Sequence, residues 1–185
     1  MNERRTSWLS VGSIVFFALA PGSVAGLIPF LLTGWRLQAP FLGLQVFRVV
    51  GSVMVLFGVG SLVESFARFA IQGRGTPAPI VPPVHLVVSG QYRYVRNPMY
   101  VAVLLIVVGQ SLILGSVALF LCAAALFLLF HAFVVLYEEP KLSARFGSTY
   151  RVYRQNVGRW WPRAKPWVSR THPRPEERGR RTTSG

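Results

Sequence analysis

Polar, potentially reactive residues gather in two short stretches of an otherwise apolar chain. One is SGQYRYVRNPMY at residues 89–100, and the other runs from His131 to Glu139 at the end of a long apolar run. The second stretch closes on two adjacent glutamates, and a carboxylate pair at the end of a hydrophobic helix is costly unless it is hydrated or paired with cations. Arg93 and Arg96 are natural partners. Two interpretations stay open on this pattern alone: interfacial charges that fix the topology, or a polar binding site.

Composition excludes several kinds of catalytic chemistry. All six acidic residues are glutamates, so the chain has no Asp dyad, no Asp-based magnesium site and no Ser-His-Asp triad. Cys122 is the single cysteine, which excludes an intrachain disulfide and a cysteine-rich metal site. Hydrophobic residues make up 52% and charged residues only 14%, where soluble domains carry roughly a quarter charged residues. The apolar residues lie in blocks, which indicates a membrane protein.

The first apolar block is long enough for a membrane span. It covers residues 8–33 behind two arginines, and about 20 helical residues cross ~30 Å of hydrocarbon. The alternative is a secretory signal with a small-residue cleavage site ending at Ala25. Because the apolar run continues through Leu32, a span suits this segment better than a cleavage site.

Two further blocks cover residues 41–63 and 99–137. A straight helix over the second of these would be nearly 60 Å long at ~1.5 Å per residue, about twice what a bilayer needs. The run must therefore fold back, and Gly115-Ser116 is its turn-like place. This predicts two spans, at residues 99–114 and 117–137.

Two single residues in these spans leave alternatives open. Arg48 either extends to the near interface or faces a polar cavity, and the first interpretation is favoured because Arg48 lies toward the end of its span. His131 is either a base facing a cavity or a histidine hydrogen-bonded within the bundle. The second interpretation is favoured for His131.

The segments outside the spans have a different character. Residues 72–98 include four prolines in a short stretch, which predicts an extended connection. Beyond the last span, Tyr150, Tyr153 and Val157 share one helical face and tryptophans follow, as in a helix lying in the membrane interface. Residues 169–185 lack apolar periodicity and are expected to be disordered. We therefore predict an all-α membrane protein with about four transmembrane helices plus a C-terminal interfacial amphipathic helix, forming one domain over residues 1–168.

The arginines predict the orientation. The N-terminus, residues 72–98 and the region from Glu138 onward carry most of the 20 Lys and Arg residues, whereas the two opposite loops hold only Arg36. The positive-inside rule then places both termini and residues 72–98 in the cytoplasm of a multi-pass cell-membrane protein. This distribution explains most of the formal charge of +14, and anionic lipid head groups attract such a basic surface, so no nucleic-acid partner is expected. Nucleic-acid binding by the basic tail is the minor alternative, because the arginines there lack the interleaved aromatic residues of a stacking surface.

Three stretches of sequence carry a resemblance to a known family. They are TPAPIVPPVHLVVSGQYRYVRNPMY, YEEPKLSARFGSTYRVYRQNV and RWWP, all within residues 75–162. Gly-x-Tyr, then Arg-Asn-Pro-x-Tyr, then Glu-Glu-x-x-Leu and Phe-Gly-x-x-Tyr after two spans form a long, ordered pattern. With this pattern the chain resembles the membrane-embedded methyltransferases related to isoprenylcysteine carboxyl methyltransferase and the phospholipid N-methyltransferases.

The resemblance implies a cofactor, S-adenosyl-L-methionine, held at the cytoplasmic end of the bundle. A carboxylate suits the ammonium or ribose hydroxyls of this cofactor, while amides opening a helix beside an arginine suit its carboxylate. Aromatic rings suit its adenine and its sulfonium. The cofactor-binding residues implied by position are His85, Leu86, Val87, Val88, Tyr92, Arg96, Asn97, Pro98, Met99, Tyr100 and Glu138.

Two departures from the prenylcysteine enzymes bear on the substrate. Asn97 replaces their histidine, and Val134 stands where they carry a substrate-binding arginine. The expected reaction is therefore methyl transfer to a hydrophobic or lipid-like substrate whose acceptor group, a carboxylate, an amine or a thiol, stays undetermined. The catalytic residues are not assigned. The alternative is a non-catalytic membrane scaffold or transporter-like protein that retains the fold.

Overall fold

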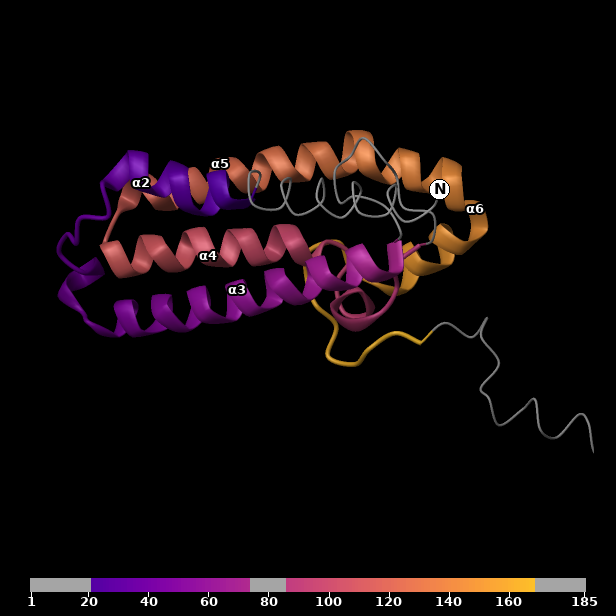
Figure 1. Cartoon of the computed structure of the whole chain (residues 1–185), viewed down its shortest axis with the longest axis horizontal. Coiled ribbons are helices and arrows are strands. Elements are labelled where there is room, and N and C mark those ends of the chain that lie inside the picture. The colour runs from indigo at the N-terminus through magenta and orange to yellow at the C-terminus, as the bar shows by residue number, and fades with distance from the viewer. Residues whose placement is uncertain (1–20, 74–85, 169–185) are drawn as a thin grey trace, which may run out of the picture.

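A computed structural model of the chain describes residues 21–73 and 86–168. Within residues 21–73, side chains are described only as far as residue 68. The part described is helical, and the helices pack lengthwise into a bundle (Figure 1). The elements, in chain order, are η1 (Ser23–Leu27), α2 (Ile28–Thr33), η2 (Phe41–Gly43), α3 (Val46–Gly73), η3 (Gly90–Arg93), α4 (Pro98–Leu114), α5 (Val117–Phe133), η4 (Val134–Glu138) and α6 (Glu139–Asn156).

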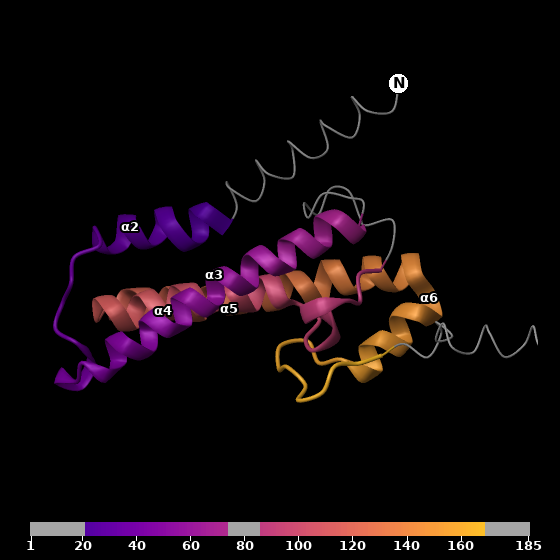
Figure 2. The ribbon, with the colours of Figure 1, turned by 60° about the horizontal axis from the view of Figure 1, so that its bottom comes forward.

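The bundle is arranged around α4. Helix α3 packs along one side of α4, while α5 and the short α2 lie on the other side (Figures 1 and 2). The turn predicted at Gly115-Ser116 is confirmed: Gly115 adopts a left-handed conformation with φ of 69°, and the Ser116 side chain caps α5 by accepting from the Leu119 amide. The two helices on either side of this turn therefore run antiparallel and return the chain to the end that it left.

Two helices are long and apolar enough to cross a membrane. One is Val46–Arg68, and the other is the continuous helical run Val117–Asn156, whereas Ser23–Thr33 and Pro98–Leu114 are shorter apolar helices. The predicted bounds of the second span, 41–63, differ from those of the helix at both ends. Residues 41–43 form the separate turn η2, and α3 begins at Val46 and continues beyond residue 63. The run from Val117 changes direction at Gly147, whose φ of 50° and ψ of −121° are not helical.

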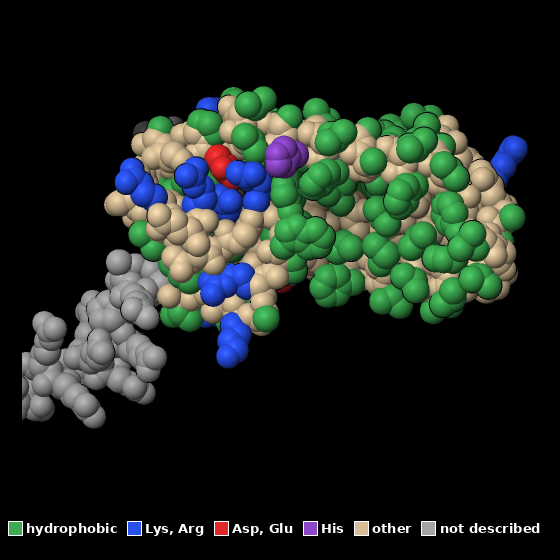
Figure 3. All heavy atoms as spheres, turned by 180° about the vertical axis from the view of Figure 1, so that it is seen from behind, with side chains coloured by type: hydrophobic (Ala, Val, Ile, Leu, Met, Phe, Trp, Pro, Cys, Tyr) green, Lys and Arg blue, Asp and Glu red, His purple; other side chains and the backbone are tan. Residues whose placement is uncertain are grey.

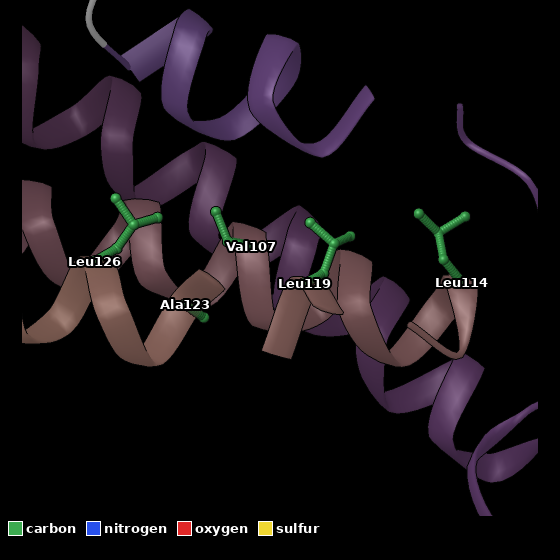
Figure 4. Close-up of a cluster of buried hydrophobic side chains, with 5 residues drawn as sticks. All are labelled: Val107, Leu114, Leu119, Ala123 and Leu126. Carbon is green, nitrogen blue, oxygen red and sulfur yellow. The ribbon is translucent and has the colours of Figure 1, made fainter. Parts of the chain in front are cut away.

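The interior of the bundle is a strip of aliphatic side chains between α4 and α5. Val107 and Leu119 are fully buried, and Leu114, Ala123 and Leu126 continue the strip along both helices (Figure 4). The outer surface is also rich in apolar side chains, since Leu56 and Phe57 on α3 are more than two-thirds exposed. Hydrophobic side chains cover much of the face shown in Figure 3. Exposed apolar area of this extent marks a surface that meets lipid rather than water.

Arg48 lies at the end of α3 away from η3. Its Nη2 donates to the carbonyl of Gln38, 2.8 Å away, in the loop that precedes α3. The favoured interpretation, in which Arg48 reaches the near end of its helix, agrees with this contact.

Helices α3 and α4 approach each other through small residues. A Cβ added at Gly109 would lie 2.7 Å from the carbonyl oxygen of Gly51 and 2.8 Å from the Val55 side chain. At Gly58 an added Cβ would lie 2.8 Å from Ile106 and 3.0 Å from the carbonyl oxygen of Ala102. Small residues at such crossings let helix backbones pack closely, which is a main source of helix association in membranes.

Replacement of Gly109 by leucine is expected to separate α3 from α4. Overpacking of a tight contact costs about 1–3 kcal/mol, so the thermal unfolding midpoint in detergent should fall by several degrees. Gly60, next to which an added Cβ meets no atom within 4 Å, offers a matched control. If Gly60→Leu lowered the midpoint as much as Gly109→Leu, the close approach would not be what holds the two helices together.

Candidate functional site

The first of the two polar stretches docks on the end of α3. Ser61 Oγ and Ser65 Oγ both donate to Gln91 Oε1, at 2.5 Å and 3.2 Å. Gly90 has a φ of 54° and lies against Arg68, which forms an ion pair with Glu64 one helical turn away. A side chain at position 90 would collide with this pair, so glycine is needed for η3 to reach α3.

The segment after α6 runs alongside the same stretch. Amides of Arg96, Arg163 and Trp167 donate to the carbonyls of Gly158, Tyr94 and Arg93 at 2.9, 3.0 and 2.9 Å. These backbone bonds join residues 93–96 to residues 158–167, more than 60 positions later. Two loops distant in sequence therefore form one unit at the end of the bundle.

Helix α6 closes this unit from the outside. The face predicted from Tyr150, Tyr153 and Val157 is confirmed, and all three side chains are buried. It packs on Leu86, Val88 and Trp167, so residues of the chain itself cover the face that was predicted to lie in the membrane interface. Tyr153 also donates its hydroxyl to the carbonyl of Tyr92 at 2.6 Å.

The structure brings the two polar stretches together. The hydroxyl of Tyr100, near the start of α4, donates to Glu138 Oε2 at 3.3 Å. The hairpin of α4 and α5 thus returns Glu138 to the depth of residues 89–100, as expected from a turn at Gly115. Tyr92, also buried, is close enough for the charge of Glu138 to act on it.

The neighbouring Glu139 forms the centre of an ion-pair network. Glu139 Oε1 accepts from Arg96 Nη1 at 2.9 Å and from Arg159 Nε at 2.7 Å, and Glu139 Oε2 accepts from Arg159 Nη2 at 2.9 Å. Arg154 Nη1 lies 3.9 Å from the same carboxylate. Of the two arginines expected to pair with the glutamates, Arg96 does so, while Arg93 donates from Nε to the carbonyl of Trp167 instead.

The two adjacent carboxyl groups differ in their pKa. The apolar part of the last span ends by Tyr137, and both glutamates lie beyond it. Burial raises the pKa of Glu138 to about 7; the hydrogen bond from Tyr100 opposes this shift, and the charge of Glu139 adds to it. Burial also acts to raise the pKa of Glu139, but the hydrogen bond from Arg159 and the charges of Arg96 and Arg159 outweigh burial and lower it. Glu139 is thus held ionised, while Glu138 titrates near neutral pH.

The other residues implied by the resemblance are placed as follows. Val87, Asn97 and Pro98 are buried, and Leu86, Val88 and Met99 are half-buried, whereas His85 lies outside the described residues. The Asn97 side chain donates from Nδ2 to the carbonyl of Arg159 at 3.1 Å, which ties the start of α4 to the segment after α6. Pro98 is the first residue of α4, one position before the predicted start of this span.

His131 is hydrogen-bonded within the bundle, which is the favoured of its two interpretations. Trp160 Nε1 donates to His131 Nδ1 at 3.1 Å, and the two rings stack with their centroids 6.1 Å apart. Glu139, Arg159 and Trp160 had no predicted role of their own. The adjacent glutamates and the RWWP motif were the available signals, but neither showed that these residues meet.

An apolar groove of about 240 Å³ opens beside this site. Its lining, which we call the α4–α5 groove, consists of Val101, Leu104, Leu105, Val108, Phe127, Trp160 and Trp161. The four α4 residues recur with the spacing of one helical face, and Tyr100 at its end has its ring 6.5 Å from that of Trp160. The groove therefore begins next to the Tyr100–Glu138 contact.

Comparison with known proteins agrees with the resemblance seen in the motifs. The sequence model of the phospholipid methyltransferase family matches residues 46–149, from the start of α3 to the last turns of α6. This chain belongs to the phospholipid methyltransferase family. It is also similar to an uncharacterized protein of Haemophilus influenzae, with 37% identity over 62 residues that cover 34% of this chain and 98% of the relative. Membership indicates a membrane methyltransferase that acts on a lipid-like substrate, in a class that generally uses S-adenosylmethionine.

Proposed function

We propose that this protein transfers a methyl group from S-adenosyl-L-methionine to a hydrophobic or lipid-like acceptor at the cytoplasmic face of the membrane. The observation that carries the proposal is the contact of Tyr100 with Glu138, because it joins the two sequence stretches on which the family resemblance rests. Within the family, we assign the chain to the type similar to isoprenylcysteine carboxyl methyltransferase. The proposed domain covers residues 1–168.

The side chains at this place fit such a cofactor. Glu138 accepts a hydrogen bond from Tyr100, and its carboxylate can accept more from an ammonium or from ribose hydroxyls. Arg96 is nearly buried, yet its Nε atom has no hydrogen-bond partner among the described residues, so a donor suited to a carboxylate remains available. Tyr92 and Tyr100 supply aromatic surface. The full proposed set is His85, Leu86, Val87, Val88, Tyr92, Arg96, Asn97, Pro98, Met99, Tyr100 and Glu138.

The chain's contribution to the reaction is then placement. S-adenosylmethionine, when bound, supplies a methyl group already activated on a sulfonium. Glu138 and Tyr100 orient this donor, and the α4–α5 groove holds the apolar part of the acceptor beside it. Positioning of two reactants in this way supplies several kcal/mol of the barrier, so the proposal requires no nucleophilic side chain.

The proposal is tested by cofactor binding and methyl transfer with the purified full-length protein. Isothermal titration with S-adenosylmethionine should show saturable binding at one site, and tritiated cofactor should transfer label to a membrane lipid extract. The non-catalytic scaffold predicts neither result. Absence of saturable binding in a folded preparation would remove the enzyme interpretation.

Membrane topology forms part of the proposal. We propose four spans, with both termini and residues 72–98 in the cytoplasm, because the basic residues concentrate there. After Cys122 is replaced, a cysteine at position 76 should be protected from an impermeant outside reagent, while one at position 37 should react. The opposite labelling pattern would reverse the orientation, and an unlabelled position 37 in intact cells would remove the four-span count.

Cofactor affinity is expected to depend on pH through Glu138. Its pKa of about 7 means that the free protein is partly protonated at neutral pH, and a cationic ligand favours the ionised form. Affinity should therefore be fully developed above pH 7 and fall as the pH drops below it, by up to about tenfold per unit. Titration calorimetry between pH 5.5 and 7.5 measures this slope. Glu138→Gln should flatten it, and an unchanged slope in that variant would assign the pH dependence to the ligand itself.

A further inference from the structure

Two buried serines near the end of α3 direct their hydroxyls away from their own helix. Ser61 and Ser65 are buried, and their spacing of four positions puts them on one helical face. A serine inside a helix commonly donates to the carbonyl four residues earlier, as Ser52 does to Arg48 at 2.9 Å. Ser61 and Ser65 instead donate to Gln91 Oε1 at 2.5 and 3.2 Å. Both hydroxyls therefore join α3 to a loop rather than to the helix itself.

Gln91 connects α3 to the turn that carries the first polar stretch. The side-chain oxygen of a glutamine has two lone pairs, so it can accept from both serines at once. The backbone carbonyl of Gln91 accepts from the amides of Tyr94 and Val95 at 2.9 and 3.1 Å, which closes the turn η3. We call the contact of Ser61 and Ser65 with Gln91 the serine–glutamine clamp. This clamp fixes the position of η3 relative to α3.

The clamp lies directly beside Tyr92. The Tyr92 side chain is buried, and the Tyr92 carbonyl accepts from Tyr153 Oη at 2.6 Å. Because Gln91 and Tyr92 are consecutive, the backbone at Tyr92 is held from α3 through Gln91 and from α6 through Tyr153. The Tyr92 hydroxyl is also close enough to Glu138 for the charge of that carboxylate to act on it. A displacement of η3 would therefore move Tyr92 relative to Glu138.

We infer that Ser61, Ser65 and Gln91 are positioning residues for cofactor binding, and that they act by holding Tyr92 in place. This inference rests on the proposed function, in which Tyr92 contacts S-adenosylmethionine. It also gives α3 a role in the cofactor site, although none of the proposed cofactor contacts comes from this helix.

The chemistry of the clamp suits placement better than adhesion. Apolar side chains could pack η3 against α3 without burying hydroxyl groups that need partners. Hydrogen bonds are directional, and a satisfied polar network rigidifies the groups that it joins. A misplacement of about 1 Å in a binding site can cost up to about 100-fold in rate, whereas hydrogen bonds between membrane helices add little stability. Loss of the clamp should therefore change cofactor binding more than it changes folding.

Gln91→Leu removes the acceptor of the clamp and nearly keeps the size of the side chain. Titration calorimetry of the full-length protein in detergent should show S-adenosylmethionine affinity about tenfold lower than in the unchanged protein. The thermal unfolding midpoint should fall by only about 2–4 °C. Ser52→Ala is the matched control and should leave the affinity unchanged, because the Ser52 hydroxyl donates within α3. A lower midpoint with unchanged affinity in Gln91→Leu would make the clamp a structural contact and overturn the inference.

Combined variants test whether the serines and Gln91 act through one contact. Ser61→Ala together with Ser65→Ala should weaken cofactor binding about as much as Gln91→Leu does. The two serine changes should cause no further loss in the Gln91→Leu background. Ser61→Thr keeps the hydroxyl and should retain the affinity that Ser61→Ala loses. Additive losses, or equal losses in Ser61→Thr and Ser61→Ala, would overturn the inference.

A second combination tests whether the clamp acts through Tyr92. Tyr92→Leu should itself weaken S-adenosylmethionine binding, and Gln91→Leu should then add no further loss, because the group that the clamp positions is already absent. A further loss of about tenfold would mean that the clamp does not act through Tyr92, and the inference would be wrong.

The same titrations keep the two proposals distinguishable. If the unchanged protein binds S-adenosylmethionine and the clamp variants bind it equally well, this inference is wrong and the proposed function stands. If the unchanged, folded protein does not bind the cofactor, the proposed function is wrong and this inference falls with it.

Discussion

Replacement of Glu139 by glutamine is expected to destabilise the end of the bundle more than any other single charge removal in the described part of the chain. The Glu139 side chain is only 7% exposed and the Arg96 side chain only 9%, so the change leaves a buried guanidinium without a counter-ion. Loss of one partner of a buried ion pair costs about 3–5 kcal/mol. For a chain of this size, that corresponds to a fall of roughly 10 °C in the thermal unfolding midpoint.

The midpoint is measured by tryptophan fluorescence in detergent, since Trp160 and Trp167 lie in the segment that the network holds in place. Glu64→Gln is the matched control, because Glu64 pairs with Arg68 on one helix and both side chains are about one-third exposed or more. Half-exposed pairs of this kind contribute at most about 1 kcal/mol. Equal shifts in the two variants would mean that Glu139 acts as an ordinary surface charge.

The sequence was sufficient to predict the helical hairpin. Glycine followed by serine is a turn signal inside an apolar run too long for one span, and the structure has its left-handed Gly115 and its capping Ser116 there. The start of α3 was less predictable. Residues 41–43 are as apolar as the helix that follows, and hydropathy cannot distinguish a short 3₁₀ turn from the first turn of a span.

Contacts made by the loops were beyond what sequence patterns could predict. The periodicity of the sequence identified the apolar face of Tyr150, Tyr153 and Val157. The same periodicity results whether lipid or protein covers such a face, so it could not predict the partner. Here Leu86, Val88 and Trp167 of the chain itself pack against it. The pairing of residues 93–96 with 158–167 uses backbone groups, which carry no side-chain signature.

The adjacent glutamates illustrate the same limit within the site. Glu138 was predicted to bind the cofactor from its position in the Glu-Glu motif. No role was predicted for Glu139. The helix directs the two side chains to different partners, and the partners of Glu139 come from residues 96, 154 and 159. The charges were visible in the sequence, but which of them meet depends on the fold, in which α6 changes direction at Gly147 between Glu139 and Arg154.

Glu138→Gln is expected to weaken S-adenosylmethionine binding by about 1.5–3 kcal/mol, or one to two decades in affinity. The amide keeps the shape of the carboxyl group and can still accept from Tyr100, but it loses the charge that would strengthen hydrogen bonds from the cofactor. Titration calorimetry at pH 7.5, where Glu138 is largely ionised, measures the loss directly.

Arg145→Gln is the control, since Arg145 is exposed on α6 and should cost the cofactor little. The unfolding midpoint supplies a second comparison, because Glu138 has no arginine partner in the described part of the chain and its replacement should leave that midpoint nearly unchanged. Glu138→Gln should therefore impair binding without unfolding, while Glu139→Gln should lower stability. Equal small losses of affinity in the Glu138 and Arg145 variants would mean that Glu138 is only an interfacial charge. The proposed cofactor site would then lose Glu138, the residue that joins its two sequence stretches.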